Sequence, residues 1–187
     1  MKKNLVILIF YILFLSSYSK VMASEEIKYE LIKKNKIFEI RKYSDRLVVQ
    51  TAKENSNKSF RKLFGYISGQ NEINQKIEMT APVTLIKEKN RTMMQFFLPS
   101  NFNENNVPNP TSSDLEILNI EGGFYAVIQY SGRSSDNNFK KYERILRDAL
   151  SNEKILIIGS EIRATYNSPF VIPSLRRNEA MFKISWN

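Results

Sequence analysis

GQNEINQKIEMTAPVTL, residues 69–85, links the end of a predicted helix to the start of a predicted strand. Gly69 is typical of the residue that follows a last helical turn, because glycine adopts the left-handed backbone conformation without strain. A mostly polar loop follows, and the chain then reads KIEMTAPV over residues 76–83. Proline has no N–H for a strand ladder, so we expect Pro82 to be the first residue of its strand or to lie on an edge.

The helix before this stretch is predicted from its capping residues and its apolar spacing. Residues 55–57 read NSN, a polar run rich in the residues that cap helix N-termini. Phe60, Leu63, Phe64 and Ile67 follow at positions i, i+3, i+4 and i+7, and this spacing places all four on one helical face.

The other apolar segments predict strands separated by turn residues. Residues 37–43 and 47–52 form a predicted hairpin around the Ser44-Asp45 turn, and residues 115–121 and 124–131 form another around Gly122-Gly123. Further strands are predicted over 81–87 and 91–98, within 155–166 and over 178–184, a second helix over 137–151, and a surface loop over 101–113.

The two halves of the chain can be superposed as sequences. Val48-Val49-Gln50 matches Val127-Ile128-Gln129 at a shift of 79, and the helix residues Phe60 and Phe139 keep that shift. Ala81-Pro82-Val83 matches Ser168-Pro169-Phe170 at a shift of 87, so the second half would gain eight residues before its third strand. The pattern predicts an α+β fold: a duplicated strand-strand-helix-strand-strand unit that forms a curved antiparallel sheet or distorted barrel, with two helices packed outside.

Composition excludes several kinds of chemistry. The 187 residues include no His and no Cys, which removes the commonest metal ligand, the usual general base, disulfides and cysteine nucleophiles. The formal charge is +9, but Lys and Asn are spread along the chain without a basic block. This distribution favours a solvated basic surface over a nucleic-acid partner, and no dedicated metal site is predicted.

Residues 1–23 have the features of a secretory signal peptide. Lys2 and Lys3 precede an apolar run, LVILIFYILFL, and residues 21–23 fit a cleavage site before Ser24. The run is much shorter than the roughly 20 apolar residues of a spanning helix, which disfavours a stable membrane anchor. We therefore expect an exported mature domain, residues 24–187, in the periplasm or outside the cell.

Several motifs resemble the SOUL haem-binding protein family. They are FRKLFGYISG at 60–69 with Asn71, KIEMTAPV at 76–83, FLP at 97–99, YNSPF at 166–170 and RRNE at 176–179. The resemblance runs from about Tyr29 to Ile184. It implies non-covalent binding of haem or another porphyrin in an apolar cleft between the first helix and the loop before the last strand.

On this chain, the implied cleft would be formed by Phe60, Lys62, Leu63, Phe64, Ile67, Phe170, Arg176 and Arg177. Lys62, Arg176 and Arg177 would meet the carboxylates of the ligand, because such groups pair well with basic side chains. Simple core packing is the better interpretation for Leu63 and Ile67. For Arg176 and Arg177, a solvated loop pair is an equal alternative.

The absence of His sets this chain apart from family members that hold iron through that residue. Tyr66, Met79, Met93 and Met94 are the remaining candidates for an axial ligand, since Tyr and Met serve so elsewhere. A methionine near a core strand is more often a packing residue. Gly65 also stands where a basic residue is expected. Both features favour hydrophobic binding without an iron ligand.

Three functions are compatible with these residues. The first is carriage or buffering of a tetrapyrrole. The second is an enzyme that removes the central metal, assisted by a carboxylate such as Glu78 or Glu179. The third is a domain that binds another amphipathic molecule or a protein, since the architecture also resembles effector-binding domains of bacterial transcription regulators.

Overall fold

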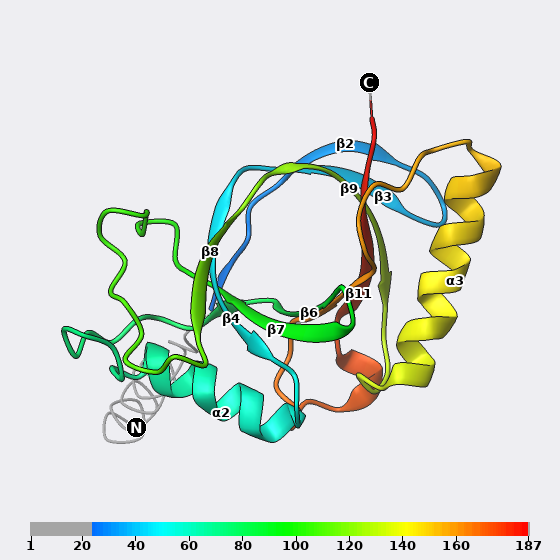
Figure 1. Ribbon diagram of the computed structural model, residues 1–187. Helices are drawn as coiled ribbons and strands as arrows, with labels where there is room; N and C mark the ends of the chain where they lie inside the picture. The colour runs from blue at the N-terminus through cyan, green and yellow to red at the C-terminus, as the bar shows by residue number, and fades with distance from the viewer. Residues whose placement is uncertain (1–23, 187) are drawn as a thin grey trace, which may run out of the picture.

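The computed structural model describes residues 24–186, and the signal-peptide prediction lies outside this range. Figure 1 shows the elements along the chain. They are β1 (Glu25–Glu26), β2 (Glu30–Lys34), β3 (Glu39–Tyr43), β4 (Arg46–Ala52), α2 (Ser56–Ile67), β5 (Thr80–Ala81), β6 (Val83–Glu88), β7 (Arg91–Phe97), β8 (Glu116–Ile120), β9 (Gly123–Tyr130), α3 (Asp136–Asn152), β10 (Ile162–Thr165), the 3-10 helix η1 (Pro173–Leu175) and β11 (Asn178–Ile184).

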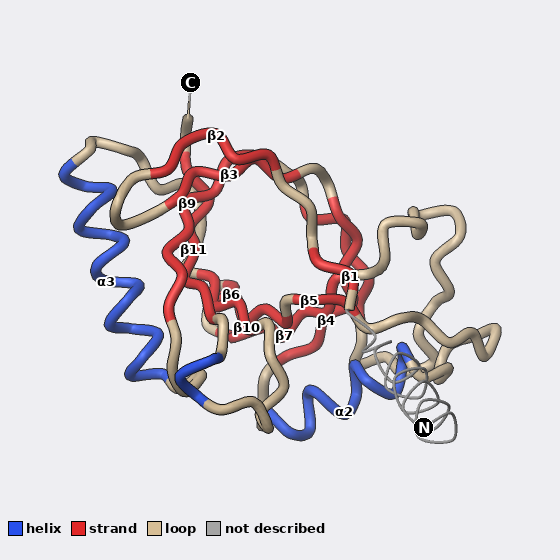
Figure 2. The backbone as a smooth tube through the Cα atoms, turned by 180° about the vertical axis from the view of Figure 1, so that it is seen from behind, coloured by secondary structure: helices blue, strands red, loops and turns tan. Residues whose placement is uncertain are grey.

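Nine of the strands form one antiparallel sheet in the order β2-β3-β9-β11-β10-β6-β7-β4-β8. The sheet curls into an incomplete ring, seen end-on in Figure 2, with α2 and α3 packed on its outer face. Strands β2 and β8 are its two free edges. The predicted fold class, α+β with a curved antiparallel sheet and two packed helices, is therefore confirmed.

The two hairpins predicted around Ser44-Asp45 and Gly122-Gly123 are both wrong, because the strands that flank each turn do not pair with each other. Strand β3 pairs with β9, and β8 pairs with β4, so each half of the chain gives its first strand to the other half. The turn residues mark where one strand ends, but they do not specify which strand lies beside it. The two connections touch: Asp45 Oδ1 accepts a hydrogen bond from the Gly122 N–H, and a Cβ at Gly122 would collide with the backbone of Tyr43.

The strand order reads alike from either side of the β6–β10 pair, but the predicted gain of eight residues before the third strand is wrong. Phe96 pairs with both Val49 and Val83, whereas Ala180 pairs with Ile128 and Arg163. Val49 and Ile128 differ by 79, so Val83 corresponds to Arg163 at a shift of 80, and Phe96 to Ala180 at a shift of 84. The third strand of the second half is thus β10, and its added residues lie mostly between β10 and β11.

Pro82 and Pro169, which the sequence superposition matched, lie in different structural surroundings. Pro82 directly precedes β6, as expected for a residue that cannot donate to the ladder. Pro169 lies in the connection between β10 and β11 and belongs to no strand. The match of residues 168–170 to residues 81–83 was a local likeness of sequence, and the strand registers overrule it.

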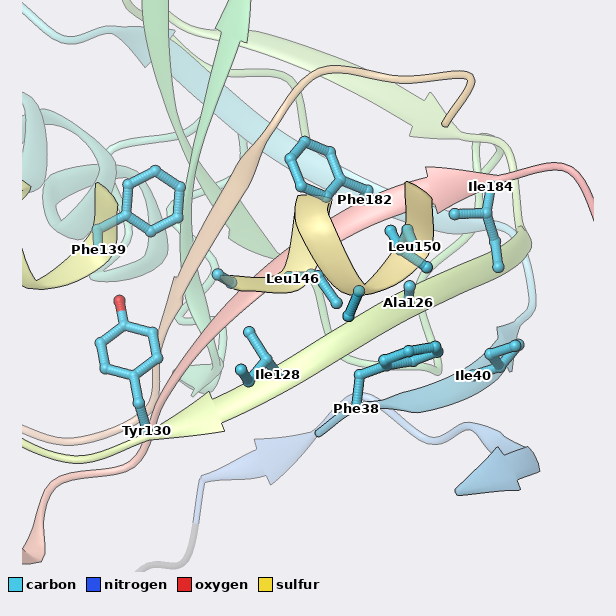
Figure 3. Close-up of a cluster of buried hydrophobic side chains, with 12 residues drawn as sticks. Phe38, Ile40, Ala126, Ile128, Tyr130, Phe139, Leu146, Leu150, Phe182 and Ile184 are labelled. Carbon is cyan, nitrogen blue, oxygen red and sulfur yellow. The ribbon is translucent and has the colours of Figure 1, made fainter. Parts of the chain in front are cut away.

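Alternate side chains of the strands face the helices outside and the concave face inside. The outer side chains form two clusters. The cluster under α2 contains Leu47, Val49, Leu63, Tyr66, Ile67, Ile77, Met94, Phe96, Leu98 and Leu115. Figure 3 shows the cluster under α3, which contains Phe38, Ile40, Ala126, Ile128, Tyr130, Phe139, Leu146, Ala149, Leu150, Ala180, Phe182 and Ile184.

Polar side chains cap both helices. Asn55 accepts a hydrogen bond from the Asn57 N–H, and Ser135 accepts one from the Asn138 N–H. Such caps satisfy backbone donors that the first helical turn leaves free. Helix α3 also carries Asp136 in its first turn, where a negative charge complements the helix dipole, whereas α2 has no acidic residue there.

Candidate functional site

The apolar stripe of α2 divides into a buried and an exposed part. Leu63 and Ile67 lie in the core, as core packing predicts. Phe60 and Phe64 are 40% and 49% exposed, and their rings stack with centroids 6.1 Å apart. Phe60 also contacts the edge of the buried Phe96 ring, with centroids 5.2 Å apart. The structure therefore presents two adjacent aromatic rings, held in place from below, on the outer surface of α2.

The loop over residues 166–177 carries the other apolar side chains of the predicted cleft. Phe170 is 94% exposed, and Ile172 and Leu175 also project into solvent. In Figures 1 and 2, this loop and the N-terminal end of α2 project at the same lower edge of the ring. Isolated apolar side chains at a surface are ordinary, but several on one loop are typical of a binding surface.

The three predicted cations already have partners within the protein. Lys62 Nζ lies 2.8 Å from Asp114 Oδ2, and this hydrogen bond raises the pKa of Lys62. Arg176 Nε donates to the Val171 carbonyl over 2.7 Å, which holds the loop in its turn. Each cation would have to leave a partner, or share it, to meet a ligand carboxylate.

Arg177 belongs to an ion network on the concave face that sequence reasoning did not foresee. Its guanidinium lies 3.1 Å from Glu179 Oε1 and 2.8 Å from Glu26 Oε2. Glu179 is completely buried, and Arg41 Nη1 reaches its other oxygen at 3.1 Å. Tyr166 also donates its hydroxyl to Glu179 over 2.7 Å. Arg177 thus connects the loop to the sheet and to the N-terminal strand β1.

The network shifts the protonation equilibria of its members. Burial disfavours the charged guanidinium of Arg41, but Glu179 and Tyr43 outweigh this effect, and the pKa of Arg41 rises. Burial, and then the charge of Glu179, raise the pKa of Tyr166. Burial likewise raises the pKa of Tyr43 to about 12. Because Arg41 and Arg177 stay charged and Tyr166 stays protonated at neutral pH, Glu179 accepts hydrogen bonds from all three side chains.

The concave face is too closely filled to hold a tetrapyrrole. A cavity of about 100 Å³ lies there, lined by side chains that include Phe97, Tyr125, Ile162 and Met181. Binding sites for drug-sized molecules usually occupy about 300–1,000 Å³. This cavity of the described residues is therefore too small for a large planar ligand unless its lining side chains move.

The candidates for an axial iron ligand are mostly engaged in packing. Tyr66 is buried, donates its hydroxyl to the Pro108 carbonyl over 2.7 Å, and has its pKa raised to about 12 by burial. Met94 is part of the core under α2, and Met79 packs against that core. Residues 24–186 contain no group of three or more acidic side chains that could hold a metal ion.

Similarity to known proteins identifies the family of this chain. The family model described as SOUL heme-binding protein matches residues 24–183. Heme-binding protein 2 of Mus musculus is 30% identical over 164 residues, covering 80% of this chain and 78% of the mouse protein. The chain belongs to the SOUL family. The resemblance found in the sequence motifs is therefore confirmed.

Solved structures with lower identity share the fold. The C-terminal domain of EcmrR matches with a TM-score of 0.59 and 13% identity, covering 85% of this chain and 99% of that domain. A protein from Listeria innocua described as a hydrolase matches with a TM-score of 0.55 and 10% identity, covering 90% of this chain and 98% of its own. At these identities the likeness establishes the architecture alone. Within residues 24–186, no helix has both the length and the apolar character needed to cross a membrane.

Proposed function

We propose that this SOUL family protein binds haem or a related tetrapyrrole non-covalently, on the outer surface formed by α2 and the 166–177 loop. The exposed, stacked pair of Phe60 and Phe64 is the observation that carries the proposal. A flat apolar macrocycle can stack on such rings, and aromatic pairs contribute about 0.5–1.5 kcal/mol beyond the area that they bury. The mouse relative's name, Heme-binding protein 2, supports the same ligand class.

Apolar contact should contribute more to this binding than ion pairing. Lys62 and Arg177 keep internal carboxylate partners, so a ligand carboxylate would have to compete with those partners. Without His or Cys, binding would not depend on strong iron coordination. The proposed site therefore recognises the macrocycle and not its metal.

Carriage or buffering fits this surface better than metal removal. Glu179, one of the two carboxylates considered for catalysis, is buried and bonded to Arg41, Arg177 and Tyr166. It has no access to a ligand on the outer surface. Glu78 is exposed and makes the enzymatic alternative testable, because loss of metal from added haemin over time would support that function.

A pair of titrations tests the proposal. Haemin and metal-free protoporphyrin are added separately to the domain of residues 24–187, and absorbance and tryptophan fluorescence are followed. The two ligands should bind within about tenfold of each other, which corresponds to 1.4 kcal/mol. A sharp low-spin spectrum with strong preference for iron would contradict this and would direct attention to the methionines.

Substitution of Phe64 locates the site. Phe64→Ala should weaken porphyrin binding by about tenfold, because it removes half of the stacked pair. Ile73→Ala is the matched control, since Ile73 is an exposed apolar residue outside the proposed surface. Arg177→Ala should weaken binding less than Phe64→Ala does, provided that circular dichroism shows a folded protein. Equal losses for Phe64→Ala and Ile73→Ala would place the ligand elsewhere.

Export is the remaining part of the proposal. The charged start and apolar run of residues 1–23 support cleavage before Ser24. Sequencing the N-terminus of protein recovered from the producing cells should therefore give Ser24, within a few residues. Recovery of full-length protein from the membrane fraction would contradict export with cleavage.

A further inference from the structure

A second hollow lies on the outer face of the sheet, between α3 and the strands β6, β7 and β10. It is a groove of about 800 Å³, lined by seven Lys and Arg side chains and three carboxylates. Leu85 and Phe139 contribute apolar surface to it. Its size falls within the range of small-molecule sites, and its charge balance favours anions.

Several of these cations have no internal partner. Lys140 and Arg144 lie one helical turn apart on the exposed surface of α3, and Lys53 and Lys87 line the groove from the strand side. Within residues 24–186, none of the four forms an ion pair. The three cations predicted near α2, in contrast, are all engaged.

Arg163 supplies an independent observation. Its side chain is only 11% exposed, lies over the Phe139 ring at 4.9 Å and pairs through Nη2 with Asp136. Its Nε is buried without a hydrogen-bond partner within the described chain. A buried guanidinium N–H without an acceptor is unfavourable, so a small movement of the Arg163 side chain toward a ligand oxygen in the groove would satisfy a need that the protein leaves open.

We propose that this groove binds an amphipathic small molecule that carries at least two anionic groups. One group would accept hydrogen bonds from Arg163, the other would lie among Lys140, Arg144 and Lys87, and the apolar body would cover Phe139 and Leu85. The groove is separate from the Phe60–Phe64 surface. The proposal therefore stands whether or not that surface binds a tetrapyrrole.

Fluorescence titration with bis-ANS, an amphipathic dianion, tests the proposal on the domain of residues 24–187. The double variant Lys140→Glu/Arg144→Glu should bind the dye at least about tenfold more weakly, since it replaces two attractions by two repulsions. Lys36→Glu is the control, because it reverses an exposed charge outside the groove, and its affinity should stay within about twofold. Salt should weaken binding to the wild-type protein, as screening shortens the Debye length to about 3 Å at 1 M.

Two further measurements address Arg163 directly. Asp136→Asn frees its guanidinium from an internal carboxylate and should tighten dye binding, by up to about fivefold. The Nε–Hε resonance of Arg163, assigned by its loss in Arg163→Lys, should shift on dye binding in the wild-type protein. An unchanged affinity in the double variant, or a resonance that does not move while the dye binds, would overturn the proposal.

The outcomes separate this site from the one on α2. If Phe64→Ala weakens bis-ANS binding and Lys140→Glu/Arg144→Glu does not, the groove proposal is refuted and the tetrapyrrole proposal is left intact. Weakening by the groove variant alone, in a protein that binds no porphyrin, would support the groove and refute the tetrapyrrole proposal.

Discussion

Gln95 and Glu179 both lie on the concave face and both pair across the ladder with a glutamine, but their surroundings differ. Gln95 pairs across the ladder with Gln50, as Glu179 does with Gln129, and these two glutamines are 79 residues apart. The direct partners of Gln95 are neutral: it donates to Gln50 Oε1 over 2.8 Å and accepts from Thr84 Oγ1 over 3.1 Å. Glu179 is surrounded by cations and a phenol.

The difference shows how a buried charge depends on long-range topology. The direct partners of Gln95 come from the first half, and the second half adds only Glu116 of β8, which accepts from Gln50 Nε2 over 3.3 Å. Glu179 requires Arg41, which reaches it because β3 pairs with β9 of the other half, and Arg177, which comes from the longer connection between β10 and β11. A buried ion is tolerated only where oppositely charged and hydrogen-bonding groups surround it. The exchanged strand β3 and the long loop provide cations to Glu179, whereas the exchanged strand β8 brings a carboxylate, Glu116, to Gln50.

Glu179→Gln should have the largest effect on stability. It replaces the buried carboxylate by a neutral amide, the side chain that Gln95 has at the compared position. Arg41 would remain buried with Glu39 as its remaining carboxylate partner. We therefore expect a loss of about 3–5 kcal/mol in the free energy of unfolding. Urea denaturation measures the change. Glu121→Gln, which affects an exposed ion pair, is the control and should change stability by less than about 0.5 kcal/mol. A loss below about 1 kcal/mol in Glu179→Gln would mean that the two networks differ little in energy.

Gln95→Ala should have an intermediate effect. It leaves the buried polar groups of Gln50 and Thr84 without one partner each, and such a group costs about 1–3 kcal/mol. The same denaturation experiment applies, with the double variant Gln95→Ala/Thr84→Val recovering part of the loss. A decrease as large as that of Glu179→Gln would remove the energetic distinction between the glutamine network and the Arg41–Glu179–Arg177 network.

Asp136→Asn should have the smallest effect on stability, and the size of this effect should depend on pH. Arg163 lowers the pKa of Asp136 below its ordinary value of 3.8, with smaller contributions from Lys53 and Lys140. The stabilisation is therefore complete above pH 3.8 and is lost as the pH falls through the lower folded value. Asp136 is largely exposed, so we expect less than about 1 kcal/mol at pH 7. The stability difference between wild type and Asp136→Asn should vanish in strongly acidic solution, and a constant difference would contradict the ion pair as its cause.

The candidate site was only partly predictable. Helical spacing correctly placed Leu63 and Ile67 in the core, but the same spacing could not tell that Phe60 and Phe64 stay exposed, since exposure depends on where the sheet ends beneath the helix. Lys62, Arg176 and Arg177 looked like available cations in the sequence. Their partners Asp114, Val171 and Glu179 became visible only in three dimensions. The internal duplication and the leader stay predictions.

The sequence by itself determined the family, the fold class, both helices and most strands, because capping residues, apolar periodicity and the KIEMTAPV stretch are local signals. It also excluded any His or Cys ligand. Only the tertiary structure decided that β3 pairs with β9 and β8 with β4, and the first of these pairs brings Arg41 to Glu179. The basic groove beside α3 was likewise visible only in the tertiary structure. Strand pairing and ion pairing join residues far apart in the chain, and their energies depend on burial, which no local pattern specifies.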